Sequence, residues 1–101
     1  MQYNKLVRDK IPQIIKKNGS TPITHIAKKK EYFSKLKEKL QEEVLEFQKE
    51  SNVDELADIQ EVIYAICAVK KITKRKLEAI RIKKALKRGS FRKKIILEKT
   101  K

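Results

Sequence analysis

The chain has 101 residues, with 27 lysine and arginine residues against 13 acidic ones, and its formal net charge is +14 at pH 7. This length fits one small domain, residues 1–101, and the presence of only two glycines and two prolines favours a helical fold. A single cysteine excludes an internal disulfide framework, and no apolar run is long enough to cross a membrane. The charged N-terminus does not resemble a secretory signal, so we expect a cytoplasmic protein with no membrane partner.

The first quarter of the chain predicts a short helix followed by an extended segment. A proline near its start and an Asn-Gly pair after its end suit a helix over 12–17. Residues 20–27 contain a proline and several β-branched side chains, which favour an edge strand. We expect residues 23–26 to pair with the apolar residues 95–97 in a minimal two-stranded ribbon.

The rest of the chain predicts an all-α fold built on a helical hairpin. Residues 29–50 repeat apolar side chains at intervals of three and four, which is typical of an amphipathic helix. A second helix over 53–70 follows Asn52, and Glu55 three positions later completes the pattern of a capping box. Its apolar arc is wide enough to indicate burial on more than one side, so we expect a homodimer or homotetramer. A last helix covers 74–87, between a capping threonine and a glycine.

An acidic stretch interrupts this basic chain. Residues 40–69 hold eight of the 13 carboxylates and one basic residue, which gives them a formal charge of −7. Two pairs stand at helical spacing, three residues apart: Glu43 with Glu46, and Glu55 with Asp58. Helical-wheel positions direct three of these four, all except Glu46, towards apolar surroundings. Like charges gathered there must bind a proton or meet a cation.

Two interpretations of these four carboxylates remain open from spacing alone. Two adjacent helices that each offer a pair of carboxylates one turn apart can supply the hard oxygen ligands of Mg²⁺, with Mn²⁺ as the alternative ion. In the other interpretation, Glu55 only completes the helix cap, while Glu43 and Glu46 form ion pairs with Lys39 and Lys49. Two further acidic residues in the stretch are expected to face solvent: Glu42 and Glu61.

Several motifs resemble the all-α NTP pyrophosphohydrolases, which include the MazG-type and phosphoribosyl-ATP pyrophosphohydrolase-like enzymes. The family signature is E-x-x-E, a loop, and then E-x-x-D. It is matched here by LQEEVLEF at 40–47 and VDELADIQEVIYAI at 53–66. YNKLVRDKIP at 3–12 and KRGSF at 87–91 resemble a small subgroup of the same family. The resemblance therefore extends over nearly the whole chain. One departure is the short spacing of eight residues between Glu46 and Glu55, which implies that the outer parts of the nucleoside pocket are either missing or supplied by another subunit.

The resemblance implies an enzyme that hydrolyses the α–β phosphoanhydride of a nucleoside triphosphate, or of a phosphoribosyl-ATP-like substrate, to a monophosphate and pyrophosphate. We favour a house-cleaning role. The implied metal ligands and catalytic carboxylates are Glu43, Glu46, Glu55 and Asp58. Substrate phosphates also require cationic donors, among which arginine can form two parallel hydrogen bonds. The candidates lie in the two flanking motifs: Lys5, Arg8, Lys10 and Arg88.

Two other functions remain as alternatives. The net charge of +14 would suit a basic helical module that binds nucleic acid. Its basic runs are scattered and lack interleaved aromatic residues, so nucleic acid is the less favoured partner. A degenerate family member that binds nucleotide without hydrolysing it is the second alternative. The lone histidine, His25, is expected to be structural or exposed, and Cys67 to be a buried, inert thiol.

Overall fold

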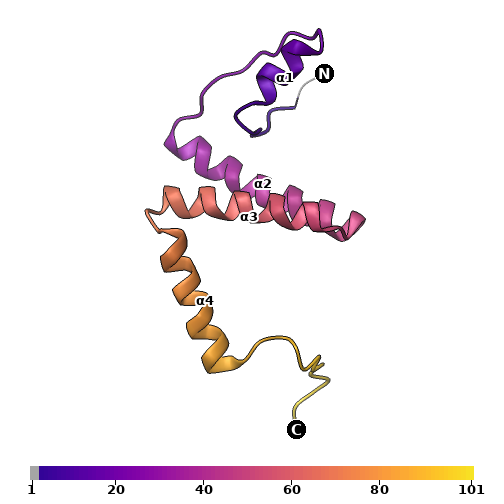
Figure 1. The fold of residues 1–101 in the computed structure, drawn as a ribbon, viewed down its shortest axis with the longest axis vertical. Coiled ribbons are helices and arrows are strands. Elements are labelled where there is room, and N and C mark those ends of the chain that lie inside the picture. The colour runs from indigo at the N-terminus through magenta and orange to yellow at the C-terminus, as the bar shows by residue number, and fades with distance from the viewer. Residues whose placement is uncertain (1–2) are drawn as a thin grey trace.

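A computed structural model describes residues 3–101, and all of its regular elements are helices. The helices are α1 (Ile11–Lys17), α2 (Lys29–Glu50), α3 (Val53–Val69) and α4 (Lys74–Arg88). Figure 1 shows α2 and α3 side by side as an antiparallel hairpin, with α1 and α4 extending from opposite sides of it. The all-α prediction is confirmed, and the predicted helix bounds differ from the observed ones by one residue at most.

The hairpin turn consists of only two residues. Ser51 ends α2 in the left-handed conformation with φ of 55°, and its backbone N–H donates to the carbonyl of Phe47. Asn52 then begins α3, and its side-chain oxygen accepts from the backbone N–H of Asp54 at 3.1 Å and of Glu55 at 3.4 Å. These bonds satisfy two amides that a helix start leaves without partners, so the predicted N-cap is confirmed.

The remaining helix ends also follow local sequence. The Thr73 hydroxyl accepts from the backbone N–H of Lys76 at 3.0 Å and caps the start of α4. Gly89 follows the last residue of α4 with φ of 87°, a left-handed value that side chains disfavour. None of the helices within residues 3–101 combines the length and the apolar character that a membrane crossing requires.

The core of this chain is small and lies between α2 and α3. Leu36 is 1% exposed, and Val62 and Cys67 are the other two buried apolar residues among those described. Cys67 is a free thiol, as predicted. The radius of gyration is 17.8 Å, against about 13 Å for a compact domain of this length. The chain therefore leaves much of its apolar surface uncovered.

The expected two-stranded ribbon is wrong. No strand occurs within residues 3–101, Ile23 is 97% exposed, and residues 95–97 are also exposed. Figure 1 places the two segments on opposite sides of the hairpin, joined to α1 and to α4 respectively. An isolated two-stranded ribbon is only marginally stable, and here neither segment has a hydrophobic face to pack against.

Because Leu36 is the most completely buried side chain, truncating it should destabilise the fold more than truncating any other leucine. We expect Leu36→Ala to lower the free energy of unfolding by about 2–5 kcal/mol, from lost contacts and the cavity left behind. Leu45→Ala on the same helix is the matched control, since Leu45 is exposed. Urea denaturation followed by circular dichroism measures both, and equal losses would contradict a core centred on Leu36.

Candidate metal and phosphate site

The candidate metal site lies around the N-terminal turn of α3. Glu55 lies in the first turn of α3 and is partly buried. This partial burial is the largest cause of a raised pKa for its carboxyl group, above the ordinary value of 4.5. The negative charges of Asp58, Asp54, Glu50 and Glu46 raise the pKa of Glu55 further, in that order. The two-residue turn thus gathers like charges from both helices around one carboxylate.

Glu43 belongs to a different environment from the other three predicted ligands. Its side chain is only 14% exposed, and its carboxylate lies 3.4 Å from the Nζ atom of Lys39 on the same helix. Lys39 therefore compensates the charge of Glu43, as the ion-pair interpretation anticipated. Glu46 is exposed, while Asp58 is half-buried. The charges of Asp58 and Glu46 act on Glu55, whereas Glu43 is paired with a lysine.

Arg8 is the phosphate-binding candidate that reaches these carboxylates. Its guanidinium donates to Asp58 Oδ1 at 2.7 Å, across 50 positions of sequence. The segment that carries it is held by a second contact, in which Lys35 Nζ donates to the carbonyl oxygen of Asn4 at 2.8 Å. A basic side chain from the N-terminal segment is thereby held against an acidic residue of α3.

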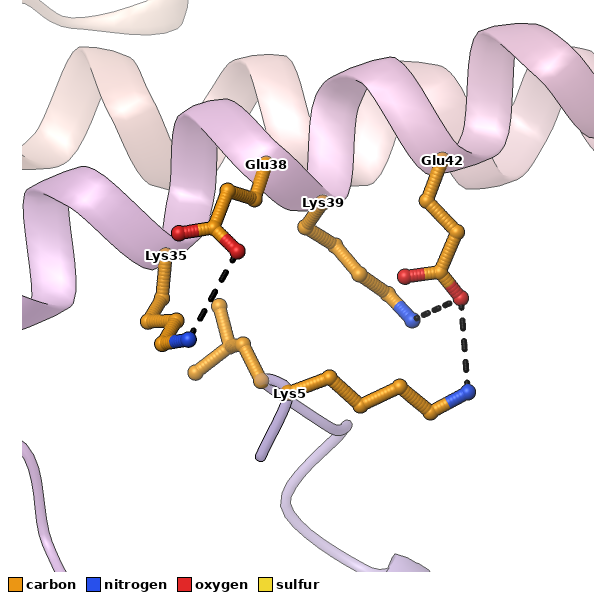
Figure 2. Close-up of a pocket in the computed structure, with 6 residues that line it drawn as sticks. Lys5, Lys35, Glu38, Lys39 and Glu42 are labelled. Atoms are coloured by element: carbon orange, nitrogen blue, oxygen red, sulfur yellow. Dashed lines mark hydrogen bonds and ion pairs between the residues drawn. The ribbon is translucent and has the colours of Figure 1, made fainter. Parts of the chain in front are cut away.

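Lys5 contacts α2 rather than the Glu55 cluster. Figure 2 shows Lys5 and Lys39 both directed at Glu42, with Nζ–Oε1 distances of 3.4 Å and 3.3 Å. These residues line a small cleft between the N-terminal segment and α2, beside a separate ion pair of Lys35 with Glu38. The side chain of Glu42 is 36% exposed and also forms these ion pairs, and Glu61 is exposed as expected. The spacing of three residues between Lys39 and Glu42 indicates, from the sequence alone, that these two side chains can form an ion pair on one face of a helix.

The two remaining phosphate candidates are not brought to the carboxylates of their own chain. Lys10 precedes the first turn of α1, and Arg88 is the last residue of α4. Neither forms an ion pair within residues 3–101. α4 packs only against α3, and Figure 1 shows it leading away from the hairpin.

Two residues outside the cluster have partners that sequence patterns did not specify. His25 Nε2 lies 3.0 Å from Glu31 Oε1 and is exposed, which agrees with the expected structural or exposed role. Tyr64 accepts a hydrogen bond from Gln60 Nε2 at 2.8 Å, and Lys74 Nζ lies 4.4 Å from the centre of its ring. Lys74 therefore makes a cation–π contact with Tyr64.

The carboxylates are not preassembled as a metal centre. Among residues 3–101, no group of three or more histidine, cysteine, aspartate or glutamate side chains is close enough to hold a metal ion. The donor chemistry nevertheless suits Mg²⁺, because all four predicted ligands are hard oxygen donors and their repulsion around Glu55 would be relieved by a cation. Half-exposed glutamate side chains can change rotamer without disturbing the buried core.

No protein-family model, no curated protein and no solved structure matches the chain. The resemblance of its motifs to all-α NTP pyrophosphohydrolases therefore stays a prediction.

Because neighbouring charges raise the pKa of Glu55, removing one should lower it. We expect Asp58→Asn to move the Glu55 pKa towards its ordinary value, since Asp58 is the largest of the charge contributions. Glu61→Gln is the control, because Glu61 does not contribute to the shift. Carboxyl-carbon NMR titration measures both variants, and an unchanged Glu55 pKa in Asp58→Asn would contradict the cluster.

The sign of the pH dependence of stability follows from the same shift. A raised pKa means that the folded chain binds the Glu55 proton more tightly than the unfolded chain does. The stabilisation by that proton is complete below the unfolded-state value of about 4.5 and is lost as pH rises through the folded-state pKa. Glu55→Gln should remove this contribution to the pH profile.

Proposed function

We propose that this protein is a Mg²⁺-dependent nucleotide pyrophosphohydrolase that cleaves nucleoside triphosphates between the α and β phosphates. The observation that carries the proposal is the ion pair between Arg8 and Asp58 one turn from Glu55, whose pKa is raised by its partial burial and by the charges of neighbouring carboxylates from both helices. Carboxylates next to an arginine provide the two kinds of group that a metal-bound polyphosphate requires. The order of the E-x-x-E, E-x-x-D and flanking motifs adds independent support.

In this proposal the metal ligands are the four signature carboxylates: Glu43, Glu46, Glu55 and Asp58. The metal would neutralise phosphate charge and lower the pKa of a bound water. Glu43 must first exchange its contact with Lys39 for the cation, and Asp58 must do the same with Arg8. Both lysine and arginine then become free to bind the anion that accompanies the metal.

The basic residues would hold the triphosphate. Arg8 is the best placed, since its guanidinium already lies at the carboxylate cluster and can bind phosphate through two parallel bonds. Lys5 and Lys10 belong to the same N-terminal segment and would add positive charge beside it. Arg88 would have to reach the site from another chain, because α4 leads away from the hairpin of its own chain.

Hydrolysis is tested by measuring pyrophosphate released from a panel of nucleoside triphosphates and phosphoribosyl-ATP in the presence of Mg²⁺. We expect Glu55→Gln and Asp58→Asn each to lower kcat/KM by at least 10- to 100-fold, roughly the loss expected even for outer-shell partners of a metal. Glu61→Gln, on the same helix but exposed, should retain activity. A wild type that is inactive on every substrate would refute the proposal.

Binding without hydrolysis is a second candidate function, favoured by the absence of a preassembled metal group within residues 3–101. Isothermal titration calorimetry with the same nucleotides distinguishes it. Micromolar binding that Arg8→Gln weakens, together with no pyrophosphate release, would identify a nucleotide-binding protein. Binding of nucleic acid instead of nucleotides would show a steep dependence on salt and none on Mg²⁺.

We also propose that the functional unit is a homodimer or homotetramer. The apolar side of α3 supports this, because Val53 and Leu56 are exposed and line a broad, open groove with Ala57, Ile59, Gln60 and Ile63. A chain with three buried apolar residues among those described gains stability by covering such a surface. Size-exclusion chromatography with light scattering should give a molar mass at least twice that of one chain, and a strict monomer at micromolar concentration would contradict the proposal.

A further inference from the structure

The last 13 residues, 89–101, form an exposed segment that we call the C-terminal arm. Four of its apolar side chains are exposed, with Phe91 at 98%, and the other three are Ile95, Ile96 and Leu97. The arm carries five basic residues and one acidic residue, a formal charge of +4. An exposed segment that combines apolar and basic side chains in this way is suited to a surface that is both apolar and acidic.

An apolar surface lies on α3, within the acidic part of the chain. The open groove lined by Val53, Leu56, Ala57, Ile59, Gln60 and Ile63, which we call the α3 groove, lies on the helix that carries Glu55 and Asp58. The hairpin stretch 40–69 has a formal charge of −7. Together, α4 and the arm hold 13 basic residues and two acidic ones, a formal charge of +11. The two halves of the chain are therefore complementary in charge as well as in apolar character.

The arm does not use this complementarity within its own chain. α4 packs only against α3, and Figure 1 shows α4 leading away from the hairpin, with the arm continuing beyond its far end. The 15 residues of α4 separate the arm from the end of the hairpin by about 22 Å of helix. The same geometry keeps Arg88 away from the carboxylates of its own chain.

We infer that the C-terminal arm of one copy docks in the α3 groove of a second copy, and that α4 thereby brings Arg88 to the carboxylates of that copy. In a twofold-symmetric dimer, each chain places its arm in the groove of the other chain, so both arms and both grooves are covered. Each chain then contributes an arm of 13 residues and a groove of six, close to the roughly 20 residues a side of a standard interface. The docking stands on charge and exposure, whereas the role of Arg88 rests on the proposed hydrolysis.

Cross-linking between differently labelled chains tests the docking without any activity measurement. In a Cys67→Ala background, one chain carries Leu56→Cys in the groove and the other carries Ile95→Cys in the arm. We expect a disulfide-linked heterodimer of these two. The matched control replaces Ile95→Cys with Ile23→Cys, an equally apolar and exposed position at the other end of the molecule, and should give little product. Equal yields would overturn the inference, as would a double variant that links only within its own chain.

Charge reversal gives a second measurement that needs no engineered cysteine. Arg92→Glu, Lys93→Glu and Lys94→Glu together should raise the dissociation constant of the dimer by at least about tenfold in analytical ultracentrifugation, because like charges then face the acidic hairpin. The control is the same change at another exposed basic run, Lys28, Lys29 and Lys30. An equal effect of the two triple variants, or no effect of the first, would refute docking by the arm.

Mixing two inactive variants tests the contribution of Arg88. Arg88→Ala and Asp58→Asn chains, mixed in equal amounts, should regain about one quarter of wild-type activity, because half of the dimers then hold one intact site of two. No recovery means that Arg88 acts within its own chain or not at all, which overturns that part of the inference. If the wild type itself hydrolyses nothing, the proposed function fails, and the cross-linking result still decides the docking.

Discussion

The short turn between α2 and α3 is the constraint on which the rest of this structure depends. Two residues, one in the left-handed conformation and one capping the next helix, bring the acidic end of α2 against the acidic start of α3. The hairpin therefore cannot form without gathering carboxylates, and the pKa of Glu55 is raised first by its partial burial and then by repulsion from its acidic neighbours. A cation at the turn, either a basic side chain or a metal ion, would relieve this repulsion.

The chain supplies cations at short range in two ways. Lys39 binds Glu43 from one turn away on the same helix, while Arg8 and Lys5 come from the N-terminal segment to reach Asp58 and Glu42. The more exposed pairs, Arg8 with Asp58 and Lys5 with Glu42, contribute only about 0–1 kcal/mol each, so they can be exchanged for a stronger ligand at little cost. In the proposed function, these ion pairs would give way when a metal ion and a phosphate bind.

The remaining positive charge lies beyond the reach of the carboxylates of its own chain. α4 and the C-terminal arm carry most of it, and they also carry apolar side chains with nothing to cover them. The apolar side of α3 is similarly uncovered, and the chain is more open than a compact domain of its length. In the proposed dimer, a second copy would offer the apolar groove of its acidic hairpin to this basic, apolar arm.

The sequence by itself determined the helices, their ends and the hairpin, because apolar periodicity, caps and turn residues act over a few positions. It also identified the acidic stretch and the four carboxylates of interest. Tertiary structure decided which distant partners the carboxylates meet: Arg8 for Asp58, and Lys5 for Glu42. It also showed that residues 23–26 and 95–97 do not pair. The ion pairs Arg8–Asp58 and Lys5–Glu42 each join segments that are tens of positions apart in the sequence. The two segments expected to form the ribbon are also far apart in the sequence, and they do not meet. Only the path of the whole chain settles such distances, and local spacing carries no information about it.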